Sequence, residues 1–422
     1  MNISVIGGGA GGFFAAISAA THHPNATVIL YEKTTKLLTK VSVSGGGRCN
    51  VTHACADVNE LIKAYPRGGK QLKTSFNLFG IADVIAWFAS KNVPFKTEED
   101  GRMFPQSNTS QTIVDCLLNE AVSLGIIIKM QTEILKIIPQ NLAQNTLQNT
   151  QKQGFLLDLK QKETDNVTES TQIYTDKVII ATGGGNKLQN FDWLADLGHT
   201  IIPPVPSLFT FNMPKNDICT LMGVSVPGAR VQIQKTKLNE VGALMITHWG
   251  MSGPAILKTS AWGARLLSEM NYEFVARVSW LSDISEENLR EKFYENKKLL
   301  NVRQINNKNP FGLPKRLWEF FLENLQLNPE KRWTDISKAE INKLTNKILN
   351  DLYEVRGKTT FKEEFVTCGG VSLADISMTT MESLHVRGLF FTGEVLDIDG
   401  ITGGYNFQAA WTTAWLAGKN VQ

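Results

Sequence analysis

Three glycines near the amino terminus have the spacing of a dinucleotide-binding turn. Gly7, Gly9 and Gly12 form a GxGxxG pattern directly after a short apolar run, and the acidic residue Glu32 follows Gly12 by twenty positions. In such a turn the glycines let the backbone approach a pyrophosphate, and the carboxylate accepts hydrogen bonds from ribose hydroxyls. The start of the following helix attracts the anionic phosphates. The sequence therefore predicts a strand, a helix and a second strand that together bind a dinucleotide.

A second glycine-rich turn near the carboxyl terminus carries two acidic residues. A buried strand is predicted to end at Gly393. Glu394 follows it directly, and Asp397 comes three residues later. Ligands of open α/β sheets collect at the carboxyl ends of strands, where these carboxylates would emerge. Gly403 and Gly404 then precede a helix, whose first N–H groups would point at an electron-rich group such as the pyrimidine edge of a reduced flavin. A plain tight turn is the alternative interpretation.

Length and composition limit the class of protein. The chain has 422 residues, of which 42% are hydrophobic and 20% are charged, and its formal net charge is +3. A chain of this length exceeds the size of a single core, so we expect two or three domains. The five cysteines are odd in number and contain no CxxC pattern. This pattern predicts neither a disulfide framework nor a metal site, and it favours a cytoplasmic location.

Residues 1–31 contain no Asp, Glu, Lys or Arg, a property shared with secretory and membrane segments. Glycines interrupt this stretch, and no basic residue begins it. These features favour a buried first strand and helix. We therefore expect no membrane association.

Shifts in composition divide the chain into three parts. Both ends are glycine-rich and apolar, which predicts one discontinuous nucleotide-binding domain of the α/β class over 1–190 and 365–422. Prolines, glycines and short apolar runs alternate over 191–282 and 351–364, which predicts a β-rich substrate domain. Residues 283–350 are charged and glycine-poor, with leucines and phenylalanines at helical spacing, so we expect a helical insertion there.

Hydrophobic periodicity predicts smaller elements of the nucleotide-binding domain. Apolar residues recur at helical spacing over 58–95 and 112–124. β-branched runs predict strands over 126–138 and 176–185, the second of which enters a glycine turn. The Gln-, Asn- and Thr-rich stretch between Pro139 and Gly154 is predicted to be a solvated hairpin loop.

Several further motifs resemble one protein family. They are Ser44-Gly45-Gly46-Gly47-Arg48-Cys49-Asn50, residues 101–105, residues 247–254, Gly369-Gly370-Val371 and residues 393–408. Together with the first glycine turn they resemble the BaiN-like (YhiN-like) flavoproteins, which are bacterial FAD-dependent oxidoreductases. The resemblance implies a discontinuous Rossmann-like FAD domain, as in glutathione reductase and fumarate reductase, with an inserted β-barrel-like domain and a helical subdomain. Leu38 and Thr39 depart from the family, which usually has glycine and a basic residue there, whereas Lys40 is retained.

The resemblance also implies which residues hold FAD. The amino-terminal glycines would hold the pyrophosphate and Glu32 the adenosine ribose, while both later glycine-rich segments would hold the ribityl chain and the ring. The residues implied are Gly7, Gly9, Ala10, Gly11, Gly12, Glu32, Lys33, Lys40, Ser44, Gly45, Gly46, Gly47, Arg48, Cys49, Asn50, Ile134, Ala181, Thr182, Gly183, Gly393, Glu394, Asp397, Gly403, Gly404, Tyr405 and Asn406.

Two residues are candidates for catalysis. His248 lies in one of the family motifs and is a candidate proton donor or substrate contact, with a loop-bracing histidine as the alternative. Arg48 is a candidate to neutralise the pyrophosphate or to anchor an anionic substrate, with a structural ion pair in the loop as the alternative. Cys49 and Cys55 lie where disulfide-reducing flavoenzymes keep a redox pair. Their six-residue offset differs from the usual five, and no second fingerprint for NADPH is evident, so we expect two unpaired thiols.

We therefore predict an FAD-dependent oxidoreductase that passes hydride between flavin N5 and a small organic substrate, or NADH or NADPH as a transient reductant. The alternative is a flavin-binding redox sensor or an RNA-associated flavoprotein without turnover. An RNA surface would need a basic stripe, and the clusters Lys297-Lys298 and Lys315-Arg316 have the pattern of solvated helix faces. We accordingly expect neither DNA nor RNA as a partner. A monomer and a homo-oligomer both remain open.

Overall fold

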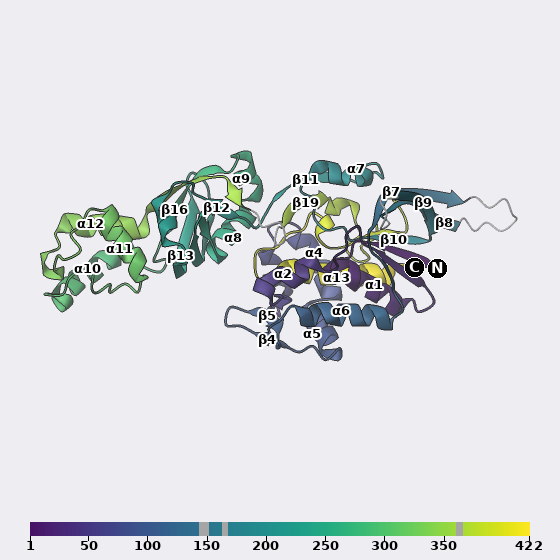
Figure 1. The fold of residues 1–422 in the computed structure, drawn as a ribbon, viewed down its shortest axis with the longest axis horizontal. Coiled ribbons are helices and arrows are strands. Elements are labelled where there is room, and N and C mark those ends of the chain that lie inside the picture. Colours follow the sequence, from purple (N-terminus) through teal and green to yellow (C-terminus); the bar gives the residue numbers. More distant parts are fainter. Residues whose placement is uncertain (143–151, 163–167, 360–365) are drawn as a thin grey trace. The chain divides into compact units, whose positions relative to one another are not determined.

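A computed structural model describes residues 1–142, 152–162, 168–359 and 366–422 (Figure 1). The chain forms two compact units. The first consists of Met1–Pro206 and Phe361–Gln422, and the second of Ser207–Thr360. The first unit is thus assembled from both ends of the chain.

A five-stranded parallel sheet forms the centre of the first unit, in the order β20-β10-β1-β2-β6. Its strands β1, β2, β10 and β20 are short, mostly buried apolar runs, as expected for a parallel sheet, whereas the edge strand β6 is largely exposed, with Ile127 45% exposed. β20 comes from the carboxyl-terminal segment, and Phe390 pairs with Ile179 of β10. The strands are β1 Asn2–Ile6, β2 Thr27–Tyr31, β6 Ile127–Lys129, β10 Lys177–Ile180 and β20 Leu389–Phe391.

Two helices from opposite ends of the chain, α1 (Ala10–His22) and α13 (Tyr405–Asn420), lie side by side (Figure 1). A Cβ added to Gly418 would lie 2.4 Å from the carbonyl oxygen of Ala15, so a glycine is needed for this close approach. The rings of Phe14 and Trp411 pack between them with centroids 5.3 Å apart. The other helices of this unit are α2 Thr39–Gly47, α3 Val58–Leu61, α4 Gly69–Leu78, α5 Ile81–Ser90, α6 Gln111–Ser123 and α7 Asp192–Ala195.

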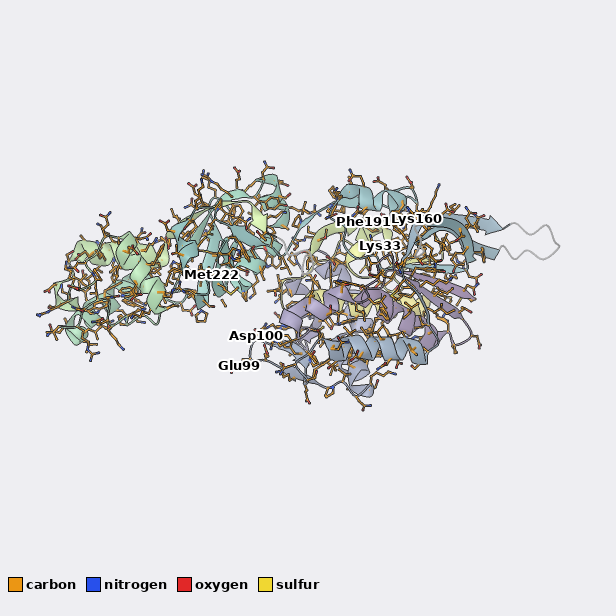
Figure 2. All side chains as sticks on the ribbon, in the orientation of Figure 1. Lys33, Glu99, Asp100, Lys160, Phe191 and Met222 are labelled. Carbon is orange, nitrogen blue, oxygen red and sulfur yellow. The ribbon has the colours of Figure 1, made fainter. Side chains whose placement is uncertain are left out.

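Three small sheets complete the described part of the first unit. They contain β3 Thr52–His53, β4 Phe95–Thr97 and β5 Arg102–Pro105; β7 Thr132–Leu142, β8 Lys152–Lys162 and β9 Thr168–Thr175; and β11 Ile201–Pro206 with β19 Thr367–Val371. The acidic residues Glu99 and Asp100 lie at the exposed turn between β4 and β5 (Figure 2). Short 3-10 turns are η1 Ile62–Ala64, η2 Leu188–Phe191, η5 Leu373–Asp375 and η6 Gly393–Val395.

Two local predictions for this unit are wrong in part. The strand predicted over 126–138 is divided into β6 and β7, because Gln131 has a positive φ of 55° and the chain turns there. The hairpin predicted between Pro139 and Gly154 is confirmed by the antiparallel pairing of β7 and β8, but its bounds are wrong, because the strands continue into the predicted loop and Pro139 pairs with Phe155. The part of that loop over 143–151 lies outside the described residues.

The second unit contains a seven-stranded sheet in the order β17-β16-β13-β14-β15-β12-β18. Its strands are β12 Thr210–Asn212, β13 Ser225–Ile233, β14 Asn239–Thr247, β15 Gly250–Ser252, β16 Glu273–Ser279, β17 Asp351–Arg356 and β18 Lys358–Thr359. The helices are α8 Pro254–Trp262, α9 Ala264–Glu269, α10 Glu286–Leu300, α11 Lys315–Asn324 and α12 Lys338–Leu349, with 3-10 turns η3 Asp217–Leu221 and η4 Trp333–Asp335.

The sheet and the helices of the second unit share one hydrophobic core. Trp280 follows the sheet strand β16, and its ring lies 5.9 Å from that of Phe321 on α11. Trp318 and Trp333 are also fully buried, and their rings stack. The helical insertion therefore packs on the sheet and does not form a separate core. Trp262, in contrast, is 41% exposed.

One predicted boundary is wrong. Residues 191–206 were expected in the β-rich domain, but Ile201 pairs with Val371 across β11 and β19, which places this segment in the first unit. The prediction failed because the prolines at positions 203, 204 and 206 resemble the proline-rich composition of the β-rich domain. Prolines are tolerated here because an edge strand does not need every N–H group for pairing.

Candidate cofactor site

The turn between β1 and α1 has the geometry that a pyrophosphate requires. Gly7 has a positive φ of 115°, and a Cβ there would lie 2.3 Å from the carbonyl oxygen of Ala181. A Cβ on Gly12 would lie 1.8 Å from the Gly7 carbonyl oxygen, whereas no described atom lies within 4 Å of a Cβ on Gly9. No described side chain caps the start of α1, and its first turn, with Ala10 and Gly11, has no acidic residue. The helix start is thus open to an anion.

Glu32 directly follows β2 and lies beside this turn. Its Oε2 accepts a hydrogen bond from the Gly8 N–H at 2.8 Å, and its Oε1 accepts one from the Thr34 N–H at 2.8 Å. Lys33 is exposed (Figure 2). Ile134 lies on β7, whose first residue, Thr132, donates its N–H to the Glu32 carbonyl at 2.9 Å. The carboxylate is therefore held next to the start of α1, and its contact with a ribose stays a prediction.

The second glycine-rich segment leaves helical geometry within α2. Ser44 is extended, and Gly45, Gly46 and Gly47 have positive φ values of 58°, 67° and 83°. All three glycines are exposed, and no described atom lies within 4 Å of a Cβ on Gly46 or Gly47. Glycines in this arrangement leave space for a bulky ligand along the backbone.

Asn50 joins this segment to the carboxyl-terminal turn. In the amide orientation that satisfies its neighbours, its oxygen accepts from the Gly404 N–H at 3.0 Å and its nitrogen donates to the carbonyls of Thr52 and Met103. Gly404 has a positive φ of 92°, and a Cβ there would lie 2.5 Å from the Thr52 carbonyl oxygen. Gly404 is the N-cap residue of α13, and as a glycine it has no side chain to accept from the first N–H groups of the helix. The helix predicted to begin after Gly403 and Gly404 is confirmed.

Glu394 lies where three segments meet. Its Oε2 accepts from Lys40 Nζ at 2.6 Å, and its Oε1 accepts from the Thr367 N–H at 2.8 Å. The Thr367 hydroxyl is buried, and no hydrogen-bond partner for it exists among the described residues. Gly184 lies against both groups, since a Cβ there would be 2.6 Å from that hydroxyl and 2.8 Å from Oε1. The neighbouring Gly183, preceded by Ala181 and Thr182, has open space around it.

The loop before α13 is braced internally. Asn406 accepts from the Gly400 N–H at 2.8 Å and donates to the Gly400 carbonyl at 2.9 Å. Asp397 donates its own N–H to the Val371 carbonyl at 2.9 Å. Asn406 thus shapes the loop with its side chain, and this contact occupies both polar atoms of its amide.

The sequence did not predict two contacts at the loop before α13, a buried ion pair and a stacked pair of aromatic rings. Arg67 donates to Asp399, whose side chain is fully buried. His53 stacks on Tyr405 with ring centroids 4.6 Å apart, and its Nδ1 lies 3.1 Å from the Gly403 carbonyl oxygen. Burial raises the pKa of Tyr405 to about 12, with further contributions from Cys55 and Asp100. The only signal in the sequence was the proximity of His53 to the SGGGRCN motif.

The two catalytic candidates lie in different environments. Arg48 Nη1 donates to Glu98 Oε1 at 2.6 Å, and the guanidinium lies 4.1 Å from the centre of the Phe104 ring. His248 is exposed in the turn between β14 and β15 of the second unit, with its ring 4.2 Å from that of Trp249. The structure therefore shows the ion pair named as the alternative role of Arg48. The catalytic roles of both residues stay predictions.

Cys49 and Cys55 are both free thiols in the described part of the chain. Cys49 is fully buried with a positive φ of 58°, and burial raises the pKa of its thiol to about 12. Cys55 is partly exposed and donates to the Asp57 carbonyl at 3.4 Å. A nucleophilic thiolate is strongly disfavoured at Cys49.

A parallel sheet whose first strand leads through a glycine turn into α1, with Glu32 beside that turn, is the arrangement of a Rossmann-like dinucleotide-binding domain. The profile of the HI0933-like protein Rossmann domain family matches residues 1–420, so the chain belongs to that family. The chain is 26% identical over 427 residues to the 3-dehydro-bile acid delta(4,6)-reductase of Clostridium scindens, a match that covers 99% of this chain and 98% of that one. It is 27% identical over 429 residues to the ribosomal RNA dihydrouridine synthase of Escherichia coli, covering 99% and 97%.

Among solved structures, 3-ketosteroid delta1-dehydrogenase from Sterolibacterium denitrificans, in complex with 1,4-androstadiene-3,17-dione, has a similar fold. The TM-score is 0.50 at 11% identity, with 99% of this chain and 98% of that one covered. The predicted family and α/β flavoprotein fold are confirmed, and the protein is an FAD-dependent oxidoreductase. Within the described ranges, every helix is too short or too polar to cross a membrane.

Proposed function

We propose that this protein reduces a carbon–carbon double bond conjugated to a carbonyl group. The observation that carries the proposal is that two relatives matched over nearly their whole lengths have names describing this chemistry. A 3-dehydro bile acid with double bonds at positions 4 and 6 is a conjugated ketone, and the 5,6-double bond of uracil is conjugated to its 4-carbonyl. In an α,β-unsaturated carbonyl compound such as uracil, hydride adds to the β carbon and a proton to the α carbon. In the conjugated dienone, reduction of the 6,7-double bond is the extended form of the same step, with hydride added to the δ carbon and a proton to the γ carbon.

The first unit supplies the groups that would hold FAD. The open start of α1 would bind the pyrophosphate, with Gly9 leaving room for it, and Glu32 would accept hydrogen bonds from the adenosine ribose. The glycine-rich backbone over 44–50 and the segment 181–183 would run along the ribityl chain and ring. The buried Thr367 hydroxyl supports a polar ligand at this place, because buried polar groups in folded proteins are almost always paired.

The carboxyl-terminal turn would hold the pyrimidine end of the flavin. FAD, when bound, supplies the two-electron hydride chemistry. The start of α13, after the N-cap residue Gly404, would present backbone N–H groups of its first turn and a positive dipole end, which favours negative charge on the neighbouring ring. Arg48 and His248 remain candidates for contacting the substrate, and NADH or NADPH is the proposed reductant.

Anaerobic stopped-flow absorbance tests this proposal. The FAD-loaded protein is mixed with NADH or NADPH, and the bleaching of the flavin band is followed. The reduced protein is then mixed with a 3-oxo-4-ene steroid, with a uridine oligonucleotide, and with cyclohexanone as a saturated ketone control. We expect reoxidation by at least one conjugated probe at a rate at least tenfold above that with cyclohexanone. Reoxidation by oxygen or quinone alone would overturn the proposal. Failure of both NADH and NADPH to bleach the flavin would favour the alternative of a flavin-binding protein without turnover.

A further inference from the structure

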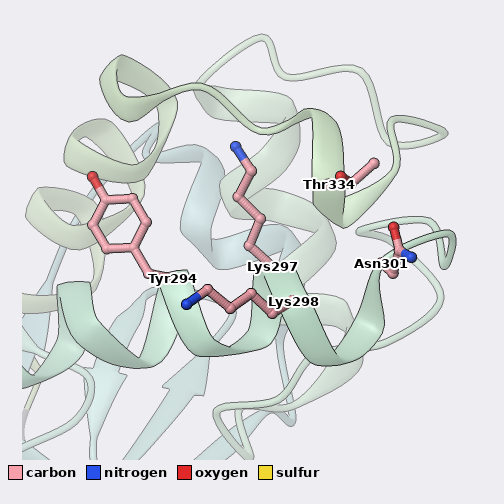
Figure 3. A pocket seen from close by; sticks show the side chains of 5 residues that line it. All are labelled: Tyr294, Lys297, Lys298, Asn301 and Thr334. Carbon is pink, nitrogen blue, oxygen red and sulfur yellow. The ribbon is translucent and has the colours of Figure 1, made fainter.

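The helical part of the second unit has a hollow at the carboxyl end of α10. The hollow has a volume of about 500 Å³ and is lined by Tyr294, Lys297, Lys298, Asn301 and Thr334. Figure 3 shows the tyrosine ring and both lysine side chains along α10, with Asn301 at its end and Thr334 beside it. None of these residues belongs to the glycine cradle of the first unit.

Positive charge is concentrated in the second unit. Residues 207–360 contain 22 lysines and arginines and 16 aspartates and glutamates, whereas the rest of the chain contains 21 and 24. The small net charge of the whole chain therefore conceals a basic unit and an acidic one. A basic unit favours an anionic partner.

The two basic clusters noted in the sequence differ in the structure. Lys315 lies 3.6 Å from Glu319, and Arg316 donates to the carbonyls of Thr220 and Met222 at 2.8 and 3.2 Å. Both side chains of the 315–316 cluster therefore already interact with other groups of the protein. In contrast, neither lysine of the 297–298 cluster forms an ion pair with a carboxylate of the described residues.

The surroundings of the second cluster add charge and apolar surface. Lys297 Nζ donates to the Ile336 carbonyl at 2.7 Å, which holds its positive charge at the hollow, and Lys298 is exposed. The exposed Arg303 accepts at its carbonyl a hydrogen bond from the Trp333 N–H, so the segment after α10 lies against η4. Tyr294 is 42% exposed. Leu299 and Val302 at the same helix end are 79% and 65% exposed.

We propose that this hollow binds a single-stranded segment of RNA, with the Tyr294 ring stacked on a base and Lys297 and Lys298 paired with phosphates. A solvent-exposed aromatic ring beside unpaired cations is the combination that single-stranded nucleic acid requires. The inference rests on the proposed function, because it names RNA as the molecule that contains the conjugated double bond to be reduced, in a uracil base. It also replaces the expectation that Lys297-Lys298 is only a solvated face.

Fluorescence anisotropy with a labelled oligouridylate and the FAD-loaded full chain tests the site. K297Q/K298Q should weaken binding at least tenfold and reduce the dependence of log affinity on log salt by about one to one and a half between about 50 and about 200 mM. Y294A should weaken binding about fivefold or more, and Y294F should leave it nearly unchanged because the ring remains. The matched control is K235Q/K237Q, which removes the same charge from an exposed turn of the same unit.

Substitution of the two lysines could also weaken RNA binding indirectly, by destabilising the end of α10. Lysines in the last turn of a helix stabilise it through the helix dipole, so thermal unfolding of each variant is recorded as well. The proposal is overturned if both double variants weaken binding equally, or if polyglutamate binds as tightly as the oligouridylate at the same salt. It is also overturned if the unaltered protein does not bind RNA. That last result leaves the proposed reduction standing if the steroid probe still reoxidises the flavin.

Discussion

Lys40 Nζ lies 2.6 Å from Glu394 Oε2, although the two residues are 354 positions apart in the chain. The other oxygen of the same carboxylate accepts from the Thr367 N–H. One side chain thus connects α2, β19 and η6 at the place where the cofactor would lie. The two ends of the chain are joined here as well as through the sheet.

The two partners of Glu394 should contribute unequally to stability. Lys40 is 45% exposed at its side chain, and exposed ion pairs contribute about 0 to 1 kcal/mol, so K40M should change the free energy of unfolding by less than about 1 kcal/mol. E394A should cost about 1 to 3 kcal/mol, because the Thr367 N–H loses its acceptor. Urea unfolding of the FAD-free protein measures both. Equal losses in the two variants would contradict the assignment.

Glu32 should matter more for FAD than for folding. E32Q retains an oxygen that can accept from the Gly8 N–H. It loses the acceptor of the Thr34 N–H, but that group is exposed and water can replace the acceptor, so the unfolding free energy should fall by only about 1 kcal/mol or less. Loss of the charge-assisted hydrogen bonds to a ribose should raise the dissociation constant of FAD at least tenfold. Equilibrium dialysis and urea unfolding measure the two quantities. D83N is a matched control, since Asp83 accepts from the Gly80 N–H at 2.7 Å away from the cradle. Similar FAD affinities of E32Q and D83N would refute the ribose role.

Spacing along the chain predicted the elements whose partners are local. The β1–α1–β2 unit and the turn before α13 follow from glycine positions and apolar periodicity, because strand, turn and helix are adjacent in sequence. The contact of Arg67 with Asp399 joins residues 332 positions apart and depends on the completed topology. For the same reason the sequence left the role of Arg48 open, because its partner Glu98 lies fifty residues away. The turn at Gln131 was missed because a positive φ at glutamine has no signal in composition.

Cys49 should be inert in the folded protein. Its thiol is fully buried with a pKa raised to about 12, so it stays protonated across the physiological pH range. Iodoacetamide at about pH 8 should leave Cys49 unmodified in the folded holoprotein and alkylate it after denaturation. Mass spectrometry of tryptic peptides measures this, with the partly exposed Cys55 as the internal comparison. A Cys49–Cys55 disulfide in the oxidised protein, reduced by NADPH, would establish the redox pair and refute this prediction.

His199 should make the first unit less stable in mild acid. It is 3% exposed, its Nδ1 lies 3.1 Å from the Leu194 carbonyl, and its Nε2 lies 2.8 Å from Ser383 Oγ. A carbonyl can only accept, so Nδ1 carries the proton and Nε2 accepts from the serine hydroxyl. Ser383 Oγ already accepts from the N–H groups of His385 and Val386, which leaves no lone pair for a protonated Nε2.

Burial accordingly lowers the pKa of His199 below its ordinary value of 6.5. The unfolded chain then binds more protons than the folded one in mild acid, so the stabilisation is complete above about pH 6.5 and is lost as pH falls below that value. One proton gives a slope of at most about 1.4 kcal/mol per pH unit. Asp375, despite the opposing effect of burial, has a lowered pKa because Thr200 and His385 donate to it, so it titrates below this window.

Urea unfolding between about pH 7.5 and about pH 5.5, followed by the release of FAD fluorescence from the first unit, measures this loss. H199N retains a donor for the Leu194 carbonyl but cannot be protonated, so its stability should vary less with pH over this range. H385Q, which removes the exposed histidine 5.5 Å away, serves as the control and should keep the dependence that His199 produces. Equal pH dependence in H199N and the unaltered protein would show that another group is responsible.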